Sequence, residues 1–299
     1  MRKRNFIRLI VIIVLVIFAS HLSQAQRNKH FGTLDIGFDL GMHSANKYNA
    51  KFYDGSQSNV NNLNFVLGNK FQYNDIKNAL ICSDTFFLSE LPTNMRYNAA
   101  FAIGLYLRKT FDNYSGINLQ INIVKLRAED VFSIEVDPNS VILSNKDLRL
   151  FSIWGVEERY NIDLSFSKYI KQKNKTFIPF FEAGINLNNT KVKEHKIKIE
   201  GLEYSLVNVY LNGSYIPGAQ QNEYDVRQGG IGWGAFISGG YRIQFNKVIL
   251  YPGLTLYMQK INLEQYNAIK PSFELNVKMS LSEVLFGEST KEEIKPDEY

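Results

Sequence analysis

Cysteine, proline and histidine are scarce in this sequence, and their scarcity narrows the class of protein. The 299 residues include one cysteine, seven prolines and four histidines. A single thiol cannot close an internal disulfide, so the fold does not depend on one, and Cys82 is interpreted as a small, partly buried hydrophobic residue. No second His or Cys stands at ligand spacing from His195, and the glycines of residues 229–234 fall inside a strand pattern rather than a phosphate loop. The sequence therefore predicts neither a metal nor a cofactor.

Long apolar runs are also missing after residue 25. Before it, residues 1–8 are basic, residues 9–19 are apolar, and Ser23 and Ala25 are small residues at the positions that a signal peptidase reads. This pattern predicts a secretory signal peptide over residues 1–25, with the mature chain starting at Gln26. The alternative, a membrane anchor, would need an apolar run of about 20 residues.

The charge balance gives no argument for a nucleic-acid partner, and the sequence predicts none. The chain has 34 Lys and Arg against 29 Asp and Glu, a net charge of +5. Four of the basic residues and none of the acids lie in the predicted signal peptide, which leaves a mature chain of nearly neutral charge. The basic character belongs to the targeting segment and not to a binding surface.

Alternation of apolar and polar residues is the main signal in the mature chain. In the first strand, for example, Phe38, Leu40 and Met42 alternate with Asp39 and Gly41. Such a period of two predicts β-strands with one apolar face. In the fourth strand the pattern breaks at Glu158, where we expect a β-bulge. The eight predicted strands cover residues 33–42, 101–108, 117–123, 154–166, 181–188, 231–245, 248–258 and 269–281.

A soluble β-sandwich would show the same alternation, but three features favour a barrel in a membrane. Long and short connections alternate along the chain, aromatic residues stand near the strand ends, and the polar face carries charges that a barrel interior can pair. The predicted fold is all-β: an eight-stranded antiparallel up-and-down transmembrane barrel over residues 26–286, with long extracellular loops, short periplasmic turns and an acidic periplasmic tail at 287–299. Residues 197–211 could add a further pair, for ten strands. The charges assigned to the barrel interior are Asp35, Asp39, Arg108, Glu182, Arg242, Glu274 and Lys278.

The signal peptide, the short Asn/Lys turns and glycine-rich strands such as residues 229–234 resemble the small outer-membrane β-barrel domain family of Bacteroidota. This resemblance covers the whole mature chain as a pattern, without a motif specific to one member. It implies an exported outer-membrane protein in contact with lipid. It also implies a role as an accessory of type IX secretion or gliding. The chain departs from the family because its last strand does not close with a terminal aromatic residue.

The loops at residues 44–97 and 189–229 are too long to be simple connections, and long loops often carry function. Residues 196–200 are predicted to continue the fifth strand beyond the membrane and to turn near Gly201. The resulting hairpin would have an edge with which another chain could pair. We therefore expect a non-catalytic barrel whose extracellular loops bind a protein or surface. A self-packed cap over the barrel mouth is the alternative. The candidate contact residues are Phe86, Phe87, Ile197, Ile199, Tyr204, Leu206, Val209 and Tyr210.

The competing hypothesis is a barrel enzyme that acts on outer-leaflet lipid, of the deacylase or acyltransferase type. Such an enzyme needs a nucleophile activated by a base, usually Ser with His and a carboxylate. His43 beside Ser44 has the right depth, but neighbours on a strand point to opposite faces. The sequence therefore assigns no catalytic residue.

Overall fold

The computed structural model describes residues 34–57, 62–112, 114–137, 147–170, 177–206, 229–245 and 248–280. The predicted signal peptide at 1–25 and the predicted tail at 287–299 lie outside these residues. No helix in the described ranges is long and apolar enough to span a membrane.

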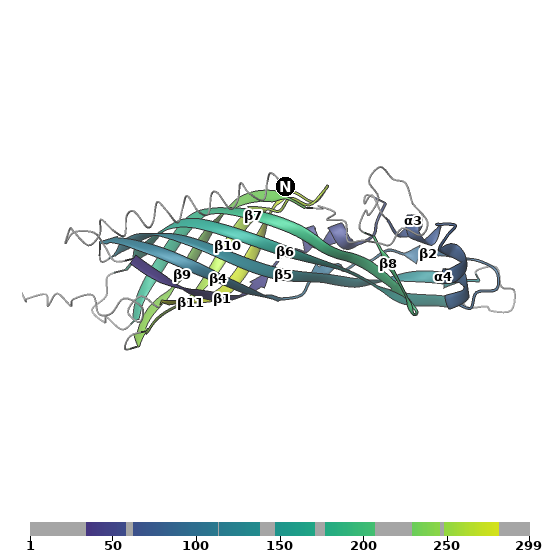
Figure 1. Ribbon diagram of the computed structural model, residues 1–299, viewed down its shortest axis with the longest axis horizontal. Coiled ribbons are helices and arrows are strands. Elements are labelled where there is room, and N and C mark those ends of the chain that lie inside the picture. The colour runs from purple at the N-terminus through teal and green to yellow at the C-terminus, as the bar shows by residue number, and fades with distance from the viewer. Residues whose placement is uncertain are drawn as a thin grey trace, which may run out of the picture.

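Eight antiparallel strands close into a barrel, as the sequence predicted (Figure 1). Each strand pairs with the next in the order β1, β4, β5, β6, β7, β9, β10, β11, and β11 pairs with β1, so the barrel has no open edge. Closure satisfies the backbone hydrogen bonds, which lipid requires. The strands are β1 (Leu34–Ser44), β4 (Ala100–Asp112), β5 (Ser115–Val136), β6 (Asp147–Tyr169), β7 (Phe177–Ile199), β9 (Ile231–Phe245), β10 (Val248–Lys260) and β11 (Ile269–Ser280).

The outer wall of the barrel is an apolar belt. On β1, Phe38, Leu40 and Met42 are exposed, while Asp39 and His43 point inward and are buried. The other strands repeat this alternation, with aromatic residues near the ends. A wall of this kind matches the lipid, and the fold is that of a transmembrane β-barrel. The aromatic residues exposed near the strand ends include Phe111, Phe166, Trp233, Tyr241 and Phe245.

Three strands run far beyond the belt. β5 has 22 residues and β6 and β7 have 23 each, whereas a membrane span needs only about 10. At about 3.4 Å per residue, residues 124–136 of β5 extend the sheet by roughly 40 Å. Figure 1 shows β5, β6 and β7 passing without a break from the barrel into this extension. We call the extension, with the elements that pack on it, the extracellular lobe.

The connection between β1 and β4 covers one face of the lobe sheet. It forms α2 (Lys47–Ala50), η1 (Lys51–Tyr53), α3 (Leu63–Leu67) and α4 (Tyr73–Ala79), and then β2 (Phe86–Glu90) and β3 (Arg96–Tyr97), which both pair with β5. At the opposite edge of the lobe sheet, β8 (Leu202–Ser205) pairs with the end of β7. The lobe sheet therefore runs from β2 and β3 through β5, β6 and β7 to β8.

Where the strands leave the belt, the apolar residues change from the outer face of the sheet to its inner face. On β5, Ile117, Ile121 and Ile123 point outward toward lipid, but from residue 124 to 136 the apolar residues other than Val131 point inward. The reversal needs no bulge in β5, which stays in register with β6 from Ser115 to Val136. The reason is the change of solvent: in lipid the outer face must be apolar, whereas in water the apolar face must pack against the covering helices.

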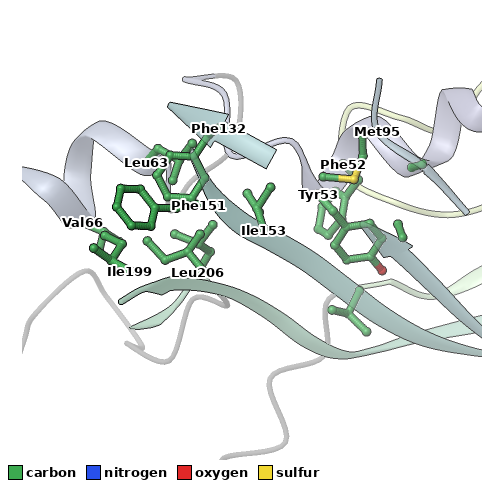
Figure 2. Close-up of a cluster of buried hydrophobic side chains, with 14 of the residues drawn as sticks. Phe52, Tyr53, Leu63, Val66, Met95, Phe132, Phe151, Ile153, Ile199 and Leu206 are labelled. Atoms are coloured by element: carbon green, nitrogen blue, oxygen red, sulfur yellow. The ribbon is translucent and has the colours of Figure 1, made fainter. Parts of the chain in front are cut away.

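These inward residues form the hydrophobic core of the lobe (Figure 2). Ile153 on β6 and Ile197 and Ile199 on β7 are fully buried, and Leu63 and Val66 of α3 pack on the same cluster. Figure 2 shows Leu63, Phe132 and Phe151 together, with Ile199 and Leu206 beside Val66. The described part of the long loop at residues 44–97 is therefore a packed cover and not a free connection.

Two sequence expectations need correction. The irregularity predicted near Glu158 is present, because the β6–β7 register shifts between Val156 and Glu157, but the extra residue is Lys193 of β7 and not a residue of β6. Residues 197–205 do not add a strand pair to the barrel. Instead they form the hairpin of β7 and β8, which lies in the lobe.

Candidate partner-binding surface

Most of the charges assigned to the barrel interior lie there in pairs. The Lys278 ammonium is 3.1 Å from Glu182, and Arg108 donates to Asn118 at 2.6 Å and also to the Tyr169 hydroxyl. Asp39 accepts a hydrogen bond from Gln120. All these side chains are nearly or fully buried, so they fill the interior and hold opposite strands together.

Two of the predicted interior charges sit differently. Arg242 is partly exposed and donates to Gln244 on the same strand, and Asp35 is also partly exposed near the periplasmic end. They contribute less to the packed interior than the buried pairs do.

His43 has a carboxylate partner but no nucleophile. Its Nδ1 lies 3.0 Å from Glu274, both side chains are about 1% exposed, and its Nε2 has no hydrogen-bond partner. Ser44 points to the opposite, exposed face. The pair is shut inside the barrel and cannot reach a lipid ester, so the arrangement lacks the geometry of a serine hydrolase.

A polar plug joins the lobe to the top of the barrel. Glu157 of β6 accepts hydrogen bonds from the hydroxyls of Tyr53 at 2.6 Å and Tyr97 at 3.1 Å, and Arg159 donates to it at 2.6 Å. Burial and the nearby carboxylate hold the pKa of both tyrosines well above its usual value, so the phenols remain donors. The plug fixes the covering segment to the barrel wall.

Most of the predicted contact residues are part of the lobe core. Ile197, Ile199, Leu206 and Phe86 are between 0% and 5% exposed, and Tyr204 is partly buried against the same cluster. Burial removes the first four from any contact surface, and for this part of the hairpin the self-packed cap is the correct description. Val209 and Tyr210 lie outside the described residues.

Phe87 is the exception, and it marks an exposed apolar surface. It is 45% exposed and pairs across β2 and β5 with Glu135, which pairs in turn with Leu148 of β6. Directly opposite residues share a face, so this row lies on the outer face of the lobe sheet, away from the helices.

The next rows extend this surface toward the membrane. Leu150 is 69% exposed and lies opposite Ser133, and Val131 is 46% exposed and lies opposite Ser152. With Phe87 of β2 and with Leu148, which is 49% exposed, they place apolar side chains from three neighbouring strands on one face. We call Phe87, Val131, Leu148 and Leu150 the tip patch.

Below the tip patch, on the side toward the membrane, the same face carries charged side chains that form ion pairs with one another. Arg127 is 2.9 Å from Glu129 and stacks over the Trp154 ring, and Lys193 is 3.0 Å from Glu158. Exposed ion pairs of this kind contribute little to stability. The tip patch is therefore the part of this face whose exposure the lobe's own packing leaves unexplained.

In the described ranges, no cluster of three or more His, Cys, Asp or Glu side chains is arranged to hold a metal ion.

The fold and the surface define the class: a small eight-stranded outer-membrane β-barrel that carries a packed extracellular lobe. No family model matches the chain, and no curated protein matches its sequence. Among solved structures it is similar to Neisserial surface protein A (TM-score 0.38, 9% identity, covering 83% of this chain and 95% of that one).

It is also similar to the outer-membrane protein OprG of Pseudomonas aeruginosa, with a TM-score of 0.33, 9% identity and coverage of 83% of this chain and 91% of that one. A third is Ail, the attachment invasion locus protein of Yersinia pestis, in complex with the heparin analogue sucrose octasulfate. Its TM-score is 0.32, with 10% identity and coverage of 84% and 96%. At such low similarity the function of this chain has to be argued from its own residues.

Proposed function

We propose that this protein is a non-catalytic outer-membrane barrel that displays its extracellular lobe for contact with a protein partner. The observation that carries the proposal is the tip patch. The lobe buries its own core on the helix-bearing face, yet four apolar side chains remain exposed on the other face, roughly 25–40 Å above the belt. Grouped apolar exposure of this kind is typical of protein interaction surfaces.

The barrel itself supports a scaffolding role. Buried pairs such as Lys278 with Glu182 fill its interior, and the Tyr53–Glu157 hydrogen bond fixes the lobe to it. A rigid base reduces the entropy cost of binding, because the contact surface is already ordered. The resemblance to barrels of Bacteroidota makes secretion and gliding assemblies the first partners to test.

The test is a charge placed in the tip patch. Leu150→Glu should abolish co-purification of the partner in mild detergent, while the heat-modifiable gel mobility of the folded barrel stays unchanged. Phe65→Glu is the matched control, since Phe65 is 54% exposed but lies on α3, on the helix-bearing side. The proposal fails if the Leu150 variant retains its partners and any secretion or surface phenotype.

The tip-patch variant is a sharper test than deleting the β7–β8 hairpin. Removing that hairpin would take Ile197, Ile199 and Leu206 out of the lobe core and unfold the lobe. Loss of partner binding would then follow from loss of structure.

A further inference from the structure

One charged side chain interrupts the apolar belt at its extracellular edge. On the outward positions of β10 and β11, in their described ranges, Lys260 is the only charged residue. Its neighbours across the two ladders are Trp233 and Ile269, which are 57% and 46% exposed. Met258, two residues before it on the same face of β10, is also exposed. The Lys260 side chain therefore extends from between apolar side chains that face lipid.

The described residues supply no counterion for this ammonium group, because Lys260 forms no ion pair with any of them. The acid nearest to it along the chain is Glu264, which is exposed in the connection after β10. Two further bases lie at the same edge. Lys47 begins α2 and is exposed, and the Lys270 ammonium lies 4.8 Å from the centroid of the Tyr48 ring. Three lysines and one glutamate leave this part of the edge with a charge of about +2.

The excess of lysine continues around the edge on β5, β6 and β7. The first charged row above the belt on these strands is Lys125, Glu158 and Lys191. Lys193 adjoins this row and is 3.0 Å from Glu158. The next row up adds one base and one acid, Arg127 and Glu194. Lysine thus outnumbers acid where the belt ends, although the mature chain as a whole is nearly neutral.

The lipid of the outer leaflet supplies the missing anion. The phosphate groups of membrane lipids lie just outside the hydrocarbon layer, which is the level at which an apolar belt ends. A lysine at the end of the belt can lay its aliphatic stem along the apolar wall and place its ammonium at this level. A tryptophan beside it is typical of the same interface, because indole has an apolar body and a polar N–H.

We propose that Lys260 and Trp233 form a binding site for an outer-leaflet lipid with a phosphate headgroup. The phosphate lies against the Lys260 ammonium, and Lys270 adds positive potential beside it. An acyl chain lies along Trp233 and Ile269, which face lipid on the two neighbouring strands. The site includes no residue of the tip patch, so it is independent of the proposed function and adds a second kind of ligand.

Quenching of Trp233 fluorescence by brominated lipids measures binding at this site. In a full-length Trp154→Phe protein, Trp233 is the only tryptophan. The protein is reconstituted in phosphatidylcholine vesicles that contain the same mole fraction of either brominated phosphatidic acid or brominated phosphatidylcholine. Phosphatidic acid should associate about fivefold more strongly than phosphatidylcholine, which is the factor expected for one lysine at an anionic surface.

Lysine variants separate a site from the general charge of the protein. Lys260→Gln should lower the preference for phosphatidic acid to less than about twofold, whereas Lys260→Arg should keep it because the charge remains. Lys198→Gln is the matched control, since it removes an exposed lysine of the lobe and should leave the preference unchanged. Equal quenching by brominated phosphatidylcholine in all variants shows that Trp233 still faces lipid.

Inorganic phosphate identifies the source of the anion. A lipid site predicts that added phosphate and sodium chloride of equal ionic strength weaken the preference equally. A larger effect of phosphate would assign the site to the free anion and overturn the lipid proposal. Equal quenching by the two lipids in the parent protein, or equal losses in the Lys260→Gln and Lys198→Gln variants, would overturn it as well. The proposed function is tested separately by Leu150→Glu, and neither result decides the other.

Discussion

The contact between the lobe and the barrel depends on a residue without a side chain. A Cβ atom added at Gly155 of β6 would lie 2.0 Å from the ring of Tyr53. That ring is fully buried, and its hydroxyl is held by Glu157 at 2.6 Å. Glycine is therefore required at position 155 for close approach, which lets η1 lie directly on the sheet.

Replacement of this glycine should detach the cover. We expect Gly155→Ala to displace Tyr53 and to destabilise the lobe by about 1–3 kcal/mol through overpacking. Faster proteolysis of the segment before β4, with an intact barrel, would show it. Gly201→Ala is the matched control, because a Cβ there meets nothing within 4 Å. Equal protease resistance of the two variants would contradict the role assigned to Gly155.

His195 predicts how the lobe responds to acid. Its side chain is buried in the lobe against the Phe52 and Tyr53 rings, 3.2 Å from the Tyr53 carbonyl, and burial lowers its pKa from 6.5 to about 4. The unfolded lobe therefore binds more protons than the folded lobe below about pH 6.5. Above that pH, His195 does not lower the free energy of unfolding of the lobe. As the pH falls from 6.5 toward 4, this free energy decreases by about 1.4 kcal/mol per pH unit.

Urea unfolding followed by the fluorescence of Trp154 measures this effect. Trp154 lies in the lobe, and the second of the two tryptophans, Trp233, is replaced by Phe. The urea concentration at the midpoint of unfolding should decrease as the pH is lowered from 6.5 to 5. The His195→Gln variant should show a smaller decrease. A midpoint with the same pH dependence in both proteins would exclude His195 as the cause.

At the scale of strands, the barrel could be predicted from the sequence and the lobe could not. Alternation places Leu254 outward and Thr255 inward correctly. In a barrel strand every second residue faces lipid and the residues between them face the polar interior, so the sequence alone shows which face is which. The predicted third strand stopped at residue 123, since Val124, Leu126 and Ala128 continue the alternation with the apolar face reversed. The reversal is visible in the sequence, and its meaning follows once the strand is known to leave the membrane there.

The candidate surface was only partly predictable for a related reason. Apolar residues in a long loop can either pack inward as a cap or face a partner, and the pattern alone does not separate the two: Phe87 is exposed, whereas Ile197 and Ile199 are buried. Which of them packs inward depends on the helices of residues 47–79, which are brought to the sheet by tertiary contacts. Leu148 and Leu150 belong to a strand extension that the sequence pattern did not reveal.

The lobe should behave as a cooperative unit separate from the barrel. Ile153→Ala, in the fully buried core, should destabilise the lobe by about 2–5 kcal/mol. Leu150→Ala, on the exposed face of the same strand, should change stability by less than about 0.5 kcal/mol. Hydrogen exchange should show faster opening of residues 124–136 only in the Ile153 variant. Equal exchange in the barrel strands of both variants is the internal control.

For the molecule as a whole, we expect no open channel. Arg108, Tyr106, Tyr169 and Tyr251 pack together near the periplasmic end, and Tyr53 with Tyr97 closes the top. An eight-stranded barrel has an interior that side chains fill. Purified protein in planar bilayers should therefore give no steady conductance. Reproducible conductance steps from the folded protein would contradict the packed interior.

The reversal of apolar faces at the top of the belt also sets the order of biogenesis. The lobe core combines helices that precede β4 with residues of β5, β6 and β7. It cannot be complete until two separate chain segments, the cover and the β5–β6 tip, have both been delivered across the membrane. Inward residues such as Leu126 and Ile134 therefore make the crossing without their final packing partners. The lobe core is therefore assembled only after both segments have reached the extracellular side.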